Sequence, residues 1–175
     1  MNKNNHVAEN LKTTIDKAER YILAALSSAV VFYVLSFAKV KDGDVVKWEL
    51  LGFPMDFSPP LALVVLYLLC IFSYLLADNL LLHIRDLITR LNDQDQVSDI
   101  LGYPSILTVS PLGSYLATVI PGTLIIFGIW NLSTQGVYPL HYAVWYFAGG
   151  FGGVLGLAVC IRIHKIISPH AEWWK

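Results

Sequence analysis

Four long apolar runs constrain the fold of this chain more than any other feature. No Lys, Arg or Glu stands in their central parts, and they cover residues 21–38, 60–79, 115–132 and 141–163. About 20 mostly apolar residues are enough to cross the hydrocarbon core of a bilayer. A soluble four-helix bundle would instead show a polar face on each helix. The runs therefore predict an all-α integral membrane protein with four transmembrane helices.

The composition agrees with a membrane protein. Charged residues make up 14% of the 175 residues, against about 25% in an average soluble domain. The net charge of −1 argues against direct nucleic-acid binding, which needs a basic face. The two cysteines, Cys70 and Cys160, stand inside apolar runs, so we expect no disulfide framework. We also expect no cleavable signal peptide, because the first run follows an amphipathic segment.

The distribution of basic residues predicts the orientation. Nine of the 12 Lys and Arg residues would lie on the side that holds both termini, and only Lys39, Lys41 and Lys47 on the other. Loops on the cytoplasmic side of a membrane are enriched in Lys and Arg. We therefore predict that residues 1–20 and the tail, residues 164–175, are cytoplasmic, and that the protein resides in a bacterial inner membrane.

Two amphipathic segments continue the first two spans. Residues 1–20 are predicted to form a helix that enters the first span, and residues 80–93 to extend the second span, so that one helix runs from about Pro59 to Asp93. Their apolar stripes contain Leu11, Ile15, Leu80, Ile84, Leu87 and Leu91. The stripes are expected to pack together, to pair with neighbouring copies or to lie on the membrane, and their mixed charge favours packing. We interpret them as a docking surface for a soluble cytoplasmic partner.

The connecting segments carry weaker signals. Residues 39–59 form an external loop in which Asp42-Gly43, flanked by apolar residues, predicts a small β-hairpin. Residues 94–114 are expected to be a cytoplasmic loop, and residues 133–140 a short external one. The acidic residues near the start of the cytoplasmic loop do not match the spacing of a calcium-binding loop.

Small residues recur four apart in the fourth run. They are Ala148, Gly149, Gly152, Gly153 and Gly156. Such rows let helix backbones approach closely, either within one chain or between copies in a homo-oligomer. In the third run, Pro121-Gly122 predicts a kink.

Asp78 and Asn79 end the second run. A span that enters at Pro60 reaches the inner boundary after about 20 residues, which makes Asp78 an interfacial or helix-packing residue. The other interpretation places Asp78, Asn79, Pro121 and Gly122 along an ion path or gate.

No pattern in the sequence indicates catalysis. HExxH, CxxC, GxSxG and a glycine-rich phosphate loop are all absent, so we expect a non-enzymatic protein without metal or cofactor, and no motif points to a known family. The main hypothesis is a homo-oligomeric membrane sensor or scaffold that recruits a cytoplasmic protein. The alternatives are an oligomeric channel or pore-forming effector, for example in bacterial stress, toxin–immunity or anti-phage defence, and an accessory subunit of a membrane enzyme complex.

Overall fold

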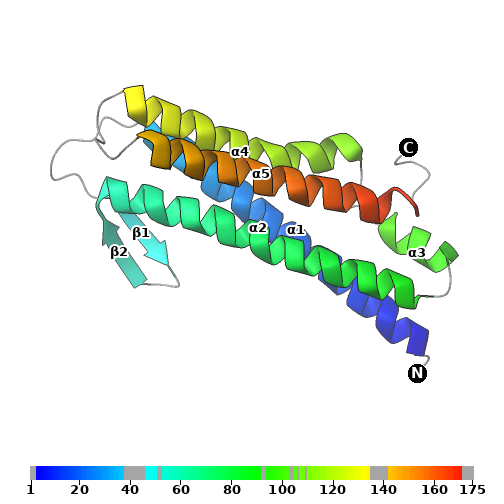
Figure 1. Ribbon diagram of the computed structural model, residues 1–175. Helices are drawn as coiled ribbons and strands as arrows, with labels where there is room; N and C mark the ends of the chain where they lie inside the picture. Colours follow the sequence, from blue (N-terminus) through cyan, green and yellow to red (C-terminus); the bar gives the residue numbers. More distant parts are fainter. Residues whose placement is uncertain are drawn as a thin grey trace.

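The computed structural model describes residues 3–37, 46–50, 53–91, 94–102, 105, 107–108, 110–134 and 142–170. Its elements are α1 (Lys3–Ser36), β1 (Val46–Leu50), β2 (Phe53–Phe57), α2 (Pro59–Arg90), α3 (Gln94–Leu101), α4 (Pro111–Thr134) and α5 (Tyr142–Ile167). The four long helices run side by side (Figure 1). The start of α1 and the end of α5 lie at one end of the bundle, here called the terminal end, and the two strands lie at the other, the hairpin end.

Each of the four long helices contains most or all of one apolar run. Each is long and apolar enough to cross a membrane, which confirms the prediction of four candidate spans. Large apolar side chains also cover the outside of the bundle. Phe147, for example, is 81% exposed, and Phe72 and Phe127 are exposed as well. A soluble monomer rarely displays so much contiguous apolar surface, whereas lipid contact requires it.

One buried stripe on α1 and one on α2 face the core. Their members recur at alternating intervals of four and three residues; they are Leu11, Ile15, Ala18, Ile22, Ala25, Ala29 and Phe32 on α1, and Cys70, Tyr74, Ala77, Leu81, Ile84, Ile88 and Leu91 on α2. A repeat of 3.5 residues is the spacing of coiled coils. The two helices are antiparallel and pack more extensively than any other described pair. We call these two sets the heptad stripes.

Helix α2 is a single uninterrupted helix, as the sequence indicated. Pro59 and Pro60 occupy its first turn, where the missing N–H groups would have had no partner in the helix. At the other end Leu91 has an extended backbone, and its N–H is shared between the carbonyls of Leu87 and Ile88. The described helix therefore ends at Arg90, close to the predicted end at Asp93.

Part of the segment predicted as a loop is helical. Residues 94–101 form α3, which contacts α1, and its Val97 and Leu101 are buried in the core. This helix has only two turns, and its buried residues Val97 and Leu101 are spaced four apart only once. A single spacing is too short for a helical period to be recognised in the sequence. Helix α4 also begins earlier than expected, with Pro111 in its first position, one turn before Tyr115.

The strand pairing differs from the predicted hairpin. Strands β1 and β2 are antiparallel, with Val46 opposite Phe57 and Leu50 opposite Phe53. The predicted turn at Asp42-Gly43 lies outside the described residues. The segment that begins at Val46 pairs with the segment that follows it in the chain, Phe53–Phe57, whereas the predicted hairpin would pair it with the residues before Asp42. Pro54 lies within β2, and each strand of a two-stranded ribbon has a free edge, where proline is tolerated.

Candidate functional site

Glycines bring α4 and α5 into backbone contact. A Cβ atom added at Gly122 of α4 would lie 2.6 Å from the Cα of Gly153 on α5. One added at Gly156 would overlap the carbonyl oxygen of Thr118. Gly149 also faces α4, through Ile126 and Ile129. The small-residue face of the fourth span is thus occupied by contacts within the chain. The side chain of Ala148 lies outside the described set.

A hydrogen bond joins a third helix to this contact. Tyr74 of α2 is fully buried, and its hydroxyl donates to the carbonyl of Thr118 at 2.5 Å. The same carbonyl is the atom that Gly156 approaches. One turn later, Pro121 lacks the N–H that the Ala117 carbonyl would accept, yet α4 continues through it. Helices α2, α4 and α5 therefore meet at one polar junction within the spans.

The four candidate gate residues do not form one polar path. Pro121 and Gly122 are buried, and Gly122 packs against α5. Asp78 pairs with Arg162 on α5, and Asn79 is exposed. Three of the four therefore have packing or pairing roles within the chain.

An ion pair links α2 and α5 near the terminal end. The Nε of Arg162 lies 2.8 Å from Oδ1 of Asp78, and the two side chains are 34% and 28% exposed. The sequence placed Asp78 at the boundary but did not identify this partner. The sequence did contain a hint of this pair. Asp78 ends the second apolar run and Arg162 ends the fourth, and both ends were predicted to lie on the same side of the membrane. Pairing lowers the cost of holding two partly buried charges within the candidate spans.

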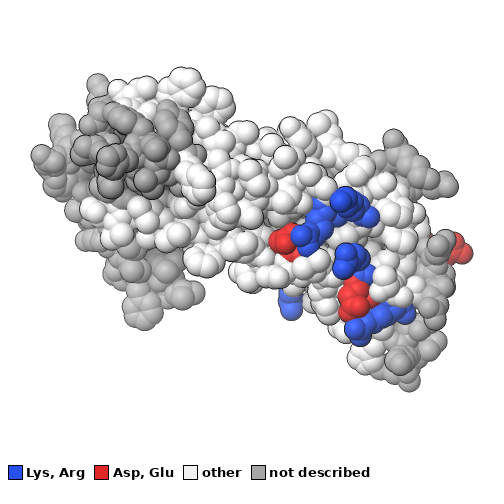
Figure 2. Space-filling model, viewed as in Figure 1, with Lys and Arg blue, Asp and Glu red and all other residues white. Residues whose placement is uncertain are grey.

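A basic pocket lies between α2 and α5 next to this pair. Its volume is about 420 Å³, and its lining comprises Leu82, Arg85, Ala158, Ile161, Arg162, Lys165 and Ile166. Figure 2 shows Lys and Arg side chains gathered on this face, toward the terminal end. Arg85 and Lys165 have no acidic partner within the described part of the chain. The pocket therefore carries uncompensated positive charge.

A second, apolar pocket lies between α4 and α5. It measures about 560 Å³ and is lined mainly by apolar side chains, with Ser114, His164 and Lys165 among the exceptions. Lys165 and Ile161 line both pockets, which therefore adjoin each other across α5. Ser114 is only 1% exposed, and its hydroxyl has no hydrogen-bond partner among the described residues.

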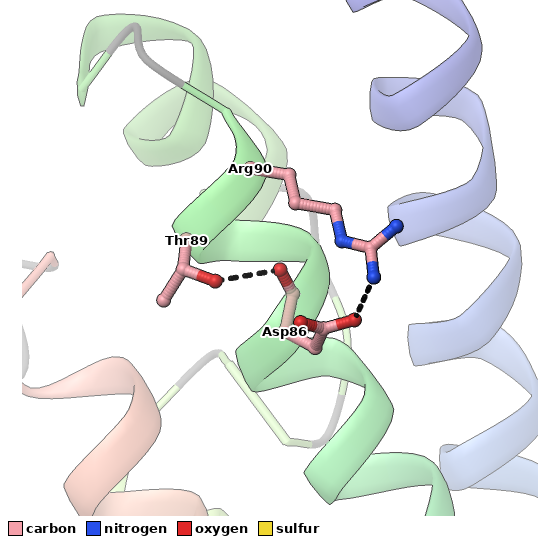
Figure 3. A network of polar contacts seen from close by, with 3 residues as sticks. All are labelled: Asp86, Thr89 and Arg90. Carbon is pink, nitrogen blue, oxygen red and sulfur yellow. Dashed lines mark hydrogen bonds and ion pairs between the residues drawn. The ribbon is translucent and has the colours of Figure 1, made fainter.

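The outer face of α2 carries a local polar network. An Nη atom of Arg90 lies 2.7 Å from a carboxylate oxygen of Asp86, and the Thr89 hydroxyl donates to the Asp86 carbonyl (Figure 3). All three residues are exposed, and the pair is four residues apart on one helix. Such a pair contributes about 0.3–0.5 kcal/mol. Its role is therefore to support the helix rather than to form a site.

The stripe interpreted as a docking surface is occupied within the chain. Leu11, Ile15, Ile84, Leu87 and Leu91 are buried in one core cluster, and Leu80 packs against it. Of the three arrangements considered for the two amphipathic segments, the structure has the one in which they pack together. A partner reaching these side chains would first have to separate α1 from α2.

The described residues contain no group of three or more His, Cys, Asp or Glu side chains that could hold a metal ion. No family model, curated protein or solved structure matches the chain. Function is therefore argued from the arrangement of the residues alone.

Proposed function

We propose that the protein is a non-enzymatic, homo-oligomeric membrane sensor or scaffold that presents a prefolded helical projection to a soluble cytoplasmic partner. The projection comprises residues 3–20 of α1 and 80–91 of α2. The observation that carries the proposal is the continuity of the heptad stripes, which run unbroken from within the spans to Leu11 and Leu91. A surface ordered in advance loses little conformational entropy when a partner binds.

The burial of the stripe changes which surface the partner would meet. The outer faces of the projection carry exposed charges of both signs, among them Lys17, Arg20, Asp86 and Arg90. Charged faces give specificity and faster association more than raw affinity. A recruited protein would therefore recognise a charge pattern on a rigid helix pair, rather than an apolar groove.

The sensor element of the proposal follows from the same continuity. Helices α1 and α2 each pass from the span into the projection without a break. A change in how the spans pack, for example from bilayer tension or composition, would therefore move the projection. The homo-oligomer part of the proposal is supported by a binding argument. Several copies would present several projections, which would raise the avidity for a partner.

The channel hypothesis gains no specific support from the described residues. Gly122 packs against α5, and the charge of Asp78 is paired with Arg162. A conducting path would then have to form between copies.

Photocrosslinking in living cells tests the scaffold function. A photoreactive residue is placed at Thr89 or Lys17, which are exposed on the projection, and at Phe72, which is exposed on the span. We expect the same soluble-protein adduct from Thr89 and Lys17 and no soluble-protein adduct from Phe72, where any protein adduct should be a second copy of the chain. Inserted protein that forms no protein adduct at either projection position would contradict the proposal. A monomeric mass in lipid nanodiscs would contradict its homo-oligomer element.

A further inference from the structure

We propose that the basic pocket between α2 and α5 binds the phosphate of an anionic phospholipid headgroup. The proposal rests on the membrane placement used in the proposed function, but not on the scaffold role. The site combines cations from two helices with an apolar wall at the end of the spans.

Three cations line the pocket and one acid offsets part of their charge. Arg162 and Lys165 are three residues apart, so they share one face of α5, and Arg85 comes from α2. Asp78 pairs with Arg162 through Nε, which leaves both Nη groups without another partner in the described chain. Two positive charges, on Arg85 and Lys165, remain unpaired. Guanidinium groups bind phosphate oxygens with two parallel hydrogen bonds, so an anion with several oxygens fits this set.

The lining of the pocket matches a lipid better than a soluble anion. Leu82, Ala158 and Ile161 form an apolar wall beside the cations. Such a wall offers no partner to a small inorganic ion, but it can contact the glycerol region and upper acyl chain of a lipid. Basic pockets between transmembrane helices on the cytoplasmic side are suited to anionic headgroups. The volume of about 420 Å³ is also within the usual range for a small-molecule site.

The adjoining apolar pocket supplies a second, independent indication of a ligand. The Ser114 hydroxyl lines it and is buried without a hydrogen-bond partner in the described chain, which is costly unless a ligand provides one. An ester carbonyl of a phospholipid is an acceptor of the right kind. Because Ile161 and Lys165 line both pockets, a single lipid can place its phosphate in one and an acyl chain in the other.

Lipid retention by the purified full-length protein tests the site. Native mass spectrometry would compare phosphatidylglycerol with phosphatidylcholine for the wild type, R85Q, K165Q and the double variant. We expect each substitution to weaken phosphatidylglycerol binding by about fivefold, the value of one basic residue near an anionic membrane, and the double variant by about 25-fold. Phosphatidylcholine has the same phosphate but no net charge, so it should bind the wild type more weakly than phosphatidylglycerol and lose less affinity in each variant.

Arg90→Gln is the matched control, since Arg90 is an exposed arginine on the same helix outside the pocket. Its phosphatidylglycerol affinity should stay within twofold of wild type. Neither Arg85 nor Lys165 has an acidic partner in the described chain, so the variants should keep the wild-type melting temperature. A folded double variant that retains phosphatidylglycerol like the wild type would overturn the proposal.

A competition arm separates the two sources of phosphate. Inorganic phosphate at millimolar concentration should leave phosphatidylglycerol bound, because it lacks the apolar contacts. Displacement at that concentration would overturn the lipid assignment in favour of a soluble phosphate compound. The two proposals can fail independently. A wild-type protein that retains no phosphatidylglycerol but crosslinks to a soluble partner would overturn only the lipid site, and one that retains the lipid but crosslinks to no partner would overturn only the scaffold function.

Discussion

The core of the projection and the contact between α4 and α5 are built in opposite ways. The projection interdigitates large side chains, such as Leu11, Ile15 and Ile84. The α4–α5 contact removes side chains, so that Gly122 and Gly153 bring two backbones together. The contrast is the one expected if the projection lies in water and the α4–α5 contact lies in lipid. Water drives large apolar groups together, whereas lipid is as apolar as leucine, and helices inside it associate through close backbone packing and hydrogen bonds.

The heptad stripe of α1 contains side chains of both sizes. Leu11 and Ile15 lie in the projection and Ala25 and Ala29 in the candidate span, but Ala18 and Phe32 reverse that order. The spacing of the stripe is kept while the size of its members varies. The comparison of the projection with the α4–α5 contact can be tested by changing one region at a time.

The largest effect is expected from a charge in the core of the projection. Ile84→Asp places an unpaired carboxylate among buried apolar side chains, which should cost about 3–5 kcal/mol. Hydrogen exchange should show residues 3–20 losing protection while the spans stay protected. His83→Asp adds the same charge at the neighbouring exposed position and should leave exchange unchanged. Equal exchange in the two variants would contradict the packing of α1 on α2.

A methyl group at the α4–α5 contact should have the next largest effect. Gly156→Ala drives a Cβ against the Thr118 carbonyl, which cannot move without α4, and should lower the free energy of unfolding in mixed micelles by about 3 kcal/mol. Gly150→Ala is the control, because nothing lies within 4 Å of its added Cβ. It should stabilise the helix by up to about 1 kcal/mol. The same sign of change for both variants would rule out the backbone contact.

Breaking the ion pair should have an intermediate effect. Asp78→Asn leaves Arg162 without its partner, at a cost of about 1–2 kcal/mol, between the values for exposed and buried pairs. The exchanged double variant, Asp78→Arg with Arg162→Asp, should recover part of that loss in thermal denaturation. If the exchange lowers stability by the sum of the two single changes, the pair does not link α2 to α5.

The smallest effect is expected at the junction of three helices. Tyr74→Phe removes the hydroxyl that donates to the Thr118 carbonyl and should cost about 1 kcal/mol. Tyr33→Phe removes a hydroxyl from a half-buried ring on α1 and serves as the control in the same denaturation experiment. An unchanged unfolding transition in Tyr74→Phe would show that the carbonyl is satisfied without it.

The sequence predicted the spans and the length of α2, because both depend on local composition and periodicity. It could not show the heptad stripe inside the spans, where every position is apolar and only the alanines of α1 mark the inward face. The partner of Asp78 was missed because Arg162 lies on another helix and depends on tertiary packing. The basic pocket was missed for the same reason, since Arg85 and Lys165 belong to different helices. The pairing of β1 with β2 was missed because the Asp42-Gly43 signal indicated a turn before Val46 rather than after Leu50.

The seven-residue repeat restricts how α1 and α2 can move against each other. A rotation of either helix about its own axis would bring polar neighbours such as Lys12 or Asp86 toward the core. A slide by less than one repeat would place the side chains of one stripe out of register with those of the other, whereas a slide by seven residues, about 10 Å, restores the seam. Intermediate positions are therefore disfavoured. Any signal passed along these helices would have to take the form of discrete registers, so the projection would switch between states rather than respond in proportion.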